Sequence, residues 1–215
     1  LGLGAFEPIK PHFLRLAAAS RVAVSISPTA PPLLSPLTRA GGWPRLCLTM
    51  ASLVEKLKAA YALVTGGKFV DALAAFGDIM AAITLVAPES RQQLHELKEL
   101  LTICREYSSA LRLEVLRKSL DPAQEPKRVV ELAAYFTHAK LQVPHVMLSL
   151  RSAMTLSFKL KLFRVASGFA RRLLELNPRP DMAATAKKVI ASCDTNPTDA
   201  FAIDYDMLNP FVVCN

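Results

Sequence analysis

The stretch from Glu131 to Pro178 constrains the fold more than any other part of the chain. Its apolar residues recur with helical spacing, and it contains a single glycine, Gly168. The stretch therefore predicts three successive amphipathic helices. None of them is long enough to bury its apolar stripe alone, so they are expected to pack on one another. This pattern predicts an all-α fold of stacked helices.

Helical spacing also extends on both sides of this stretch. About seven helices are predicted in total, with no convincing strand, beginning near Ser52, Lys68, Pro88, Lys127, Pro144, Phe163 and Asp181. Ser52 and Asp181 are expected to cap the first and last helices, and Pro88 to lie in the first turn of a long helix that ends near Ser119. Its seam of Leu94, Leu97, Leu101, Cys104, Ser108, Leu111 and Val115 resembles a heptad repeat.

The spacing of these helices is typical of helical hairpins. Gly66-Gly67 separates the first two, as expected for an αα-hairpin. The pattern F-x-x-A-x-x-x-[F/A] at 69–76 and 163–170 resembles tetratricopeptide repeats, although no strict repeat of about 34 residues holds. We therefore predict an irregular tetratricopeptide-like α-solenoid, a helical hairpin array, with a disordered N-terminal segment and an extended C-terminal tail.

Residues 1–49 differ in composition from the rest of the chain. They contain seven prolines. They also contain serines and arginines, but only one acidic residue, Glu7. This composition is typical of an organelle transit peptide, and equally of a translated non-coding leader upstream of Met50. The first residue is leucine, which favours the leader, and no stable packing is expected here. The expected domains are 1–49 (leader or transit-like), 50–194 (helical) and 195–215 (acidic tail).

The net charge of +8 is unevenly distributed. Lys140 to Lys188 holds ten basic and two acidic residues, whereas no Lys or Arg follows Lys188 and four aspartates do. Such a block followed by an acidic tail indicates a surface for an acidic partner, a tail that folds back on the block, or simply solvated helix faces.

Two groups of residues are candidates for protein binding. The first is the basic run Lys159, Lys161, Arg164, Arg171 and Arg172. It suits an acidic protein or lipid headgroups better than nucleic acid, because the nearby phenylalanines fall at packing positions. The second is the turn-prone Asn209, Pro210 and Phe211, a motif typical of ligands of endocytic adaptor domains. Burial of Phe211 against the helices is the alternative.

Catalytic and metal-binding patterns are absent from the sequence. His95, His138 and His145 have no Cys or carboxylate at metal-ligand spacing, and the four cysteines form no C-x-x-C pair. No nucleophile motif or glycine-rich phosphate loop occurs. His138 is expected to be structural, as a cation at the C-terminus of its helix. We predict that the chain is not an enzyme and that it needs no cofactor, metal or small-molecule substrate.

Several motifs together resemble one known family. They are LVEKLKAAYALVTGGKFVDAL (53–73), ELLTICREY (99–107), ELAAYFTH (131–138), FARRLLELNP (169–178), NPTDA (196–200) and IDYDMLNPFVVC (203–214). In this order they resemble the C-terminal domain of the alpha subunit of coatomer, the COPI vesicle coat. Asp204 stands where the family usually has Asn, and the final NPFVVC resembles the plant and green-algal version.

The resemblance implies a scaffold role in Golgi-to-endoplasmic-reticulum and intra-Golgi transport. It implies docking of the epsilon subunit of coatomer, interactions with the other subunits of the coat, and peripheral association with the cytoplasmic side of the Golgi membrane and with COPI-coated vesicles. The β-propeller regions that read cargo in the family are absent, so cargo binding is not implied. The family continues past NPF into a small terminal module, and this chain stops at Asn215. The alternative function is a basic helical module that binds anionic membrane or nucleic acid, and a third is an organelle-targeted protein.

Overall fold

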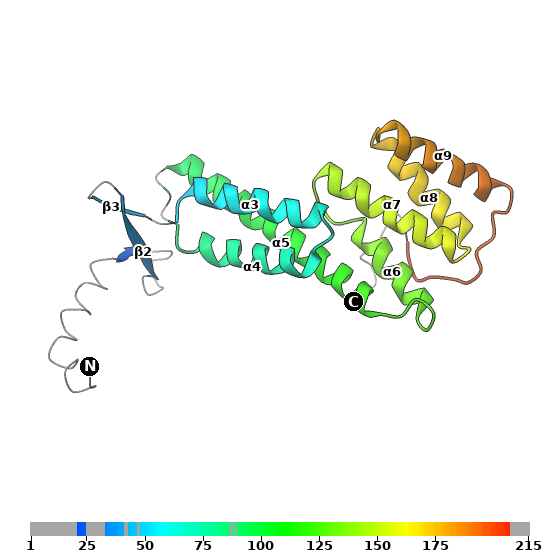
Figure 1. Cartoon of the computed structure of the whole chain (residues 1–215), viewed down its shortest axis with the longest axis horizontal. Coiled ribbons are helices and arrows are strands. Elements are labelled where there is room, and N and C mark those ends of the chain that lie inside the picture. Colours follow the sequence, from blue (N-terminus) through cyan, green and yellow to red (C-terminus); the bar gives the residue numbers. More distant parts are fainter. Residues whose placement is uncertain are drawn as a thin grey trace. The chain divides into compact units, whose positions relative to one another are not determined.

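A computed structural model describes residues 21–24, 33–40, 43–46, 48–86, 88 and 90–206. Within these residues it contains seven helices (Figure 1), namely α3 (Met50–Thr65), α4 (Phe69–Ile83), α5 (Arg91–Ser119), α6 (Pro126–Phe136), α7 (Val143–Lys159), α8 (Phe163–Glu175) and α9 (Pro180–Asp194). The prediction of an all-α array of about seven helices is confirmed for 50–194. No helix in the described part is long and apolar enough to span a bilayer.

The structure differs from the sequence prediction at three short strands, β1 (Arg21–Val24), β2 (Leu33–Ala40) and β3 (Trp43–Leu46). They form an antiparallel sheet in the order β1-β2-β3, with Ala40 opposite Trp43. Only Gly41-Gly42 lies between β2 and β3, which is a strong hairpin signal in a sequence. The composition of residues 1–49, on which the prediction of no stable packing depends, does not contain this information.

The chain divides into two compact units. The first comprises residues 1–59 and 77–102, and the second comprises 60–76 and 103–215. Within the first unit, Leu53, Ile79 and Leu97 are buried, as their helical spacing predicts. Leu94 and Leu101 are more than 40% exposed, so the heptad-like seam predicted for this part of α5 is wrong at these two positions. Leu97 is buried as the seam predicts, and Leu100, which lies outside the predicted seam, is buried as well.

Helix starts in the first unit also differ from prediction. Thr49 precedes α3, and its hydroxyl oxygen accepts a bond from the Ser52 amide at 3.3 Å while the Thr49 amide donates to the Ser52 hydroxyl at 3.1 Å. This reciprocal pair is a capping box, so the N-cap is Thr49 rather than Ser52. Ser90, whose hydroxyl accepts from the Gln93 amide, caps α5, which therefore begins after Pro88.

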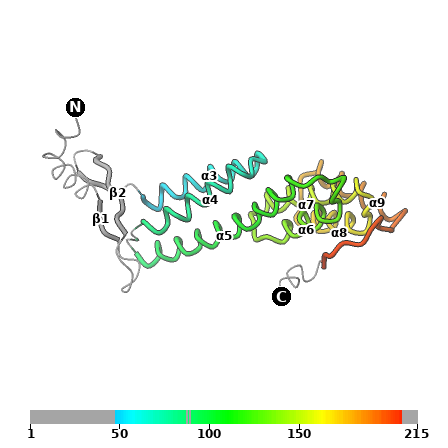
Figure 2. The backbone as a smooth tube through the Cα atoms, turned by 90° about the horizontal axis from the view of Figure 1, so that it is seen from below, coloured from blue at the N-terminus to red at the C-terminus, as the bar shows by residue number. Residues whose placement is uncertain are grey.

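The second unit contains α6 to α9 together with the adjoining ends of α3, α4 and α5. Helix α7 packs on α6 and α8, and α8 packs on α9. Figure 2 shows these four helices grouped together. Their common core includes Leu150, Met154, Phe169 and Leu173, each buried, and the alanines between them allow close helix contact. The stacking of helices predicted for Glu131 to Pro178 is thus confirmed.

Two turns within the second unit require the left-handed region. Gly67 between α3 and α4 has φ of +72°, which agrees with the hairpin predicted from Gly66-Gly67. Asn177 adopts φ of +50° after α8 and is followed by Pro178, so the helix ends where predicted. Asp181 lies in the first turn of α9 without accepting a capping bond, and Arg179 occupies the N-cap position. The predicted cap at Asp181 is therefore wrong.

Candidate functional site: the helical surface of α6 to α9 and its tail

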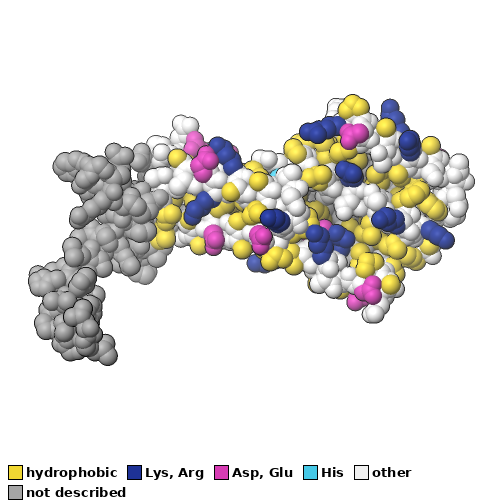
Figure 3. All heavy atoms as spheres, in the orientation of Figure 1, with side chains coloured by type: hydrophobic (Ala, Val, Ile, Leu, Met, Phe, Trp, Pro, Cys, Tyr) yellow, Lys and Arg dark blue, Asp and Glu magenta, His cyan; other side chains and the backbone are white. Residues whose placement is uncertain are grey.

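The five basic candidate residues do not form one surface. Lys159 ends α7, Lys161 lies in the following turn, and Arg164, Arg171 and Arg172 are spread along α8. All are exposed except Arg172, which is half-buried. The face of the molecule in Figure 3 shows Lys and Arg side chains scattered over these helices among apolar side chains. Four of the five residues lie on helices as predicted, whereas Lys161 lies in the turn between α7 and α8. The sequence did not reveal that the five divide into separate groups.

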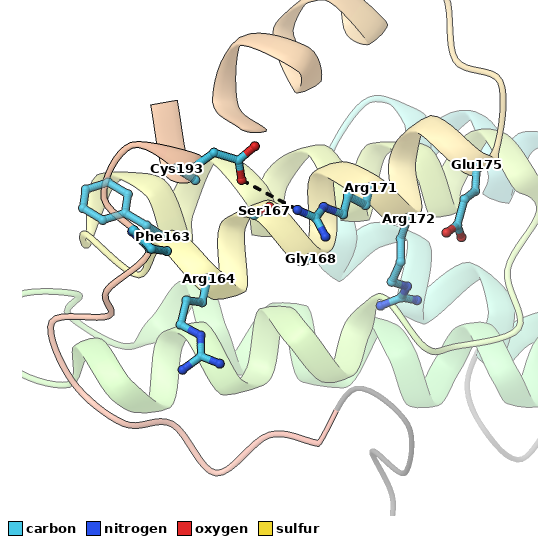
Figure 4. Close-up of a pocket in the computed structure, with 10 residues that line it drawn as sticks. Phe163, Arg164, Ser167, Gly168, Arg171, Arg172, Glu175 and Cys193 are labelled. Carbon is cyan, nitrogen blue, oxygen red and sulfur yellow. Dashed lines mark ion pairs between the residues drawn. The ribbon is translucent and has the colours of Figure 1, made fainter. Parts of the chain in front are cut away.

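A pocket of about 470 Å³ lies between α8 and α9, and Arg164, Arg171 and Arg172 all contribute to its lining (Figure 4). Arg171 turns towards Asp194 at the end of α9, with 3.6 Å between Nη2 and the carboxylate oxygen. Arg164 and Arg172 point to the other side of α8. Because both partners of the Arg171–Asp194 pair are well exposed, the pair contributes little to stability.

Arg172, which lies on α8, connects this helix to the C-terminal end of α6 through hydrogen bonds. Its Nη1 donates to the Thr137 hydroxyl at 3.0 Å and its Nη2 donates to the Thr137 carbonyl at 3.1 Å. Nη1 also lies 3.2 Å from His138 Nε2 and 3.4 Å from the Tyr205 hydroxyl. A guanidinium cannot accept a hydrogen bond, so Nε2 of His138 must be the acceptor here. These contacts assign Arg172 a structural role within the fold.

His138 is consequently uncharged in the folded chain. Burial, and to a lesser degree the Arg172 guanidinium, lower the pKa of His138 to about 4. The Tyr205 hydroxyl lies 2.5 Å from the same Nε2 atom, which suits donation to a neutral imidazole. The structural role predicted for His138 agrees with this geometry, but the expected cation at a helix end is wrong, because a nearby cation and burial disfavour the charged form.

The chain after α9 folds back on the helices. In Figure 1 it turns from the end of α9 towards α6. The Asp199 carboxylate accepts from the Arg164 amide at 2.9 Å, and Asp204 pairs with Lys127 at 2.8 Å. The ring of Tyr205 lies 5.8 Å from that of Phe169. Of the alternatives raised by the charge pattern, the structure supports a tail that folds back, through residue 206. Asn209, Pro210 and Phe211 lie outside the described residues.

A second buried polar cluster lies where α3, α5 and α7 meet. The Gln142 amide donates to the Tyr107 hydroxyl at 2.9 Å, and this hydroxyl lies 2.7 Å from Nδ1 of His145. Nε2 of His145 lies 3.0 Å from the Thr65 hydroxyl, which itself donates to the Tyr61 carbonyl. A neutral His145 protonated on Nε2 satisfies every partner, and burial lowers its pKa accordingly. Apart from a lone histidine, no pattern in the sequence predicts this cluster.

The described residues contain no cluster of His, Cys, Asp or Glu that could hold a metal ion. Cys104 is fully buried, and burial raises the pKa of its thiol to about 11, so it is a packing residue and not a nucleophile. The arrangement brings together hydrogen-bonded structural clusters and surface hollows. These features are those of an all-α helical domain without a recognisable catalytic centre among the described residues.

Comparison with known proteins identifies the family. The family model that describes the C-terminus of the coatomer (COPI) alpha subunit matches residues 1–215. The chain is 42% identical over 221 residues to coatomer subunit alpha of Dictyostelium discoideum, and 40% identical over 225 residues to coatomer subunit alpha-1 of Arabidopsis thaliana; both comparisons cover all of this chain and 18% of the relative. Coatomer subunit alpha of Saccharomyces cerevisiae is 34% identical over 143 residues, covering 66% of the chain.

The chain therefore belongs to the family formed by the C-terminal regions of coatomer alpha, and the resemblance noted in the sequence is confirmed. This is a family of structural coat components and not of enzymes. The chain spans about 18% of the length of the curated relatives it matches first. The matched region includes residues 1–49, whose composition alone favoured a leader or a transit peptide.

Proposed function

We propose that this chain is a docking domain of the COPI coat that binds the epsilon subunit of coatomer. Through the coat it associates peripherally with the cytoplasmic side of Golgi membranes and with vesicles in Golgi-to-endoplasmic-reticulum and intra-Golgi transport. The observation that carries the proposal is the family match over the whole chain. An array of packed helices is the kind of structure on which another protein docks.

The alternative, a basic module for anionic membrane or nucleic acid, has less support from the arrangement of charges. Phosphate binding requires several unpaired cations on one surface. Arg172 is committed to Thr137, and Arg171 pairs with Asp194. The candidate cations are further divided between two helices and the turn that joins them. Salt dependence separates the two functions, because phosphate contacts weaken by orders of magnitude between about 50 and 200 mM salt.

Co-purification tests the proposed function. The full chain and the epsilon subunit of coatomer are mixed at micromolar concentration and run together on gel filtration at low and moderate salt. Co-elution under both conditions is expected, and separate elution of two folded proteins would contradict the proposal.

The same experiment with a chain that begins at Leu48, where Thr49 still caps α3, tests the proposed division at residue 49. If the helical domain 50–194 and its tail carry the interface, co-elution is retained. Loss of co-elution by a truncated chain whose circular dichroism remains helical would show that the preceding residues contribute to docking.

A further inference from the structure

Two neighbouring hollows of different character lie along α7, and together they are called the α7 groove. One hollow, of about 480 Å³, is lined by Arg117, Arg151 and Lys159 among others. The other, of about 160 Å³, lies against the loop between α3 and α4 and the end of α6. Leu148 and Ser152 line both hollows, so the two lie next to each other.

The smaller hollow suits one large apolar side chain. Val64, Phe69, Phe136 and Leu148 contribute its apolar wall. A cavity of about this size in another protein accepts benzene. Its polar lining does not call for a polar ligand, because His145 already satisfies both ring nitrogens with Tyr107 and Thr65. Leu148 is 38% exposed where the two hollows meet, so its side chain offers apolar surface to an occupant.

The larger hollow suits carboxylates. Arg117 is neutralised within the fold, since Nε and Nη2 donate to the two carboxylate oxygens of Glu114 at 2.7 and 2.6 Å. Arg151 and Lys159 are both exposed, and neither has a carboxylate within ion-pair distance among the residues that the structure describes. No acidic residue occurs in α7 at all. Eight residues separate these two cations, which places them about 12 Å apart along the helix axis.

The chain itself offers no acidic segment to fill this groove. In the tail, Asp204 is bound to Lys127 and Asp199 to the backbone of Arg164. The sequence from 207 to 215 contains no Asp or Glu, and the sequence from 1 to 47 contains only Glu7. These two segments therefore supply no acidic occupant, and charge complementarity with Arg151 and Lys159 is the observation that points to an acidic partner.

We infer that the groove along α7 is a docking site for an acidic segment of a partner protein that carries one large apolar side chain. The apolar side chain enters the hollow beside Leu148. Two carboxylates, about as far apart as Arg151 and Lys159 are along the helix, form ion pairs with these two cations. A membrane surface would satisfy the cations but would leave the apolar hollow unfilled, so the combined geometry favours a peptide. The inference goes beyond the proposed function, because it holds whether or not the epsilon subunit binds.

The test uses the full chain and a labelled synthetic peptide that contains one Phe and several Glu residues, with fluorescence anisotropy as the readout. Two matched peptides replace the Phe by Ala or every Glu by Gln. The double variant Arg151→Glu/Lys159→Glu reverses the groove charges. Lys187→Glu/Lys188→Glu makes the same charge change on exposed residues of α9 that do not line the groove.

We expect the groove variant to weaken binding of the Phe–Glu peptide by about tenfold or more, because two attractive contacts become repulsive. The α9 variant should change binding by less than about twofold, and both matched peptides should bind more weakly than the original. Equal losses in the two protein variants, or equal binding of the Ala peptide, would overturn the inference. So would failure of the wild-type chain to bind the Phe–Glu peptide at low salt.

A second variant keeps the test independent of net charge. Ser152 lies in both hollows and is exposed, so Ser152→Trp should block the groove and abolish peptide binding while the helices remain folded by circular dichroism. Ser192→Trp, an exposed position of α9, is the control and should bind normally. Phosphatidylcholine vesicles with phosphatidylserine are tested in parallel. Charge-dependent vesicle binding that Ser152→Trp leaves intact, without peptide binding, would assign the cations to a membrane and reject the inference.

Discussion

Arg172 of α8 donates two hydrogen bonds to Thr137 at the end of α6, one to its hydroxyl at 3.0 Å and one to its backbone carbonyl at 3.1 Å. The two residues belong to helices that do not follow each other in the sequence, and α7 lies between them in the chain. The Thr137 carbonyl is one of those that a helix end leaves without an intrahelical partner. A cation that satisfies it also ties α8 to α6.

Replacing Arg172 by Met should therefore destabilise the fold. The variant leaves the Thr137 carbonyl without its partner, at a cost of about 2 kcal/mol in the free energy of unfolding. Arg171→Met removes the neighbouring charge, whose partner Asp194 is exposed, and should cost less than about 0.5 kcal/mol. Urea unfolding of both variants measures the difference. Equal stability of the two variants would show that the Thr137 contact is not important.

The fold of α6 to α8 could be predicted from the sequence wherever hydrophobic periodicity determines the secondary structure. The apolar residues of α6 to α8 recur with helical spacing, so helices and core followed from local patterns. The helix ends were harder to predict from the sequence. Ser52 and Asp181 are residue types that often cap helices, but the N-cap positions are occupied by Thr49 and Arg179. Such choices differ by about 1 kcal/mol, which tertiary packing readily overrides.

The candidate site could be predicted only in part. Charge counts identified the basic block of α7 and α8, but a count cannot tell an exposed cation from one that bonds a helix end. Arg172 and Arg171 are adjacent in sequence and differ completely in role. The role of Tyr205 depends on a chain reversal after α9, and the importance of Arg151 depends on hollows formed by separate helices. No local pattern contains that information.

The fold should lose stability as the pH falls from about 6.5. In the folded chain the pKa of His138 is about 4, below its ordinary value of 6.5, and burial also lowers the pKa of His145. In this range the unfolded chain binds more protons than the folded chain, so the stabilisation present above pH 6.5 decreases on acidification. Thermal unfolding between pH 7 and 5 measures the slope.

His138→Gln should flatten this slope because it removes one of the two titrating groups, while Gln retains an acceptor for Arg172. A wild-type melting temperature that stays constant between pH 7 and 5 would contradict the buried neutral histidines.

Removal of the Tyr107 hydroxyl should also be costly. This hydroxyl accepts from the Gln142 amide and reaches Nδ1 of the buried His145, so Tyr107→Phe leaves both groups without this partner. We expect a loss of about 1–3 kcal/mol in the free energy of unfolding. Tyr135→Phe removes an exposed hydroxyl that donates to the Asp204 carbonyl, and should cost less than about 1 kcal/mol. Chemical denaturation compares the two, and a smaller loss for Tyr107→Phe than for Tyr135→Phe would argue against the buried cluster.

The tail after α9 should depend on Tyr205 for its position. The ring lies near Phe169, Tyr135 and His138, whereas the remaining tail contacts that the structure describes are mostly exposed hydrogen bonds and ion pairs. Tyr205→Ala removes this packing and should release the tail, so chymotrypsin cleavage after the half-buried Phe201 should accelerate by about tenfold or more. Tyr205→Phe retains the ring and should be cleaved only slightly faster than the wild type. Mass spectrometry of the digests over time identifies the cleavage site, and unchanged cleavage of Tyr205→Ala would show that the tail is held by other contacts.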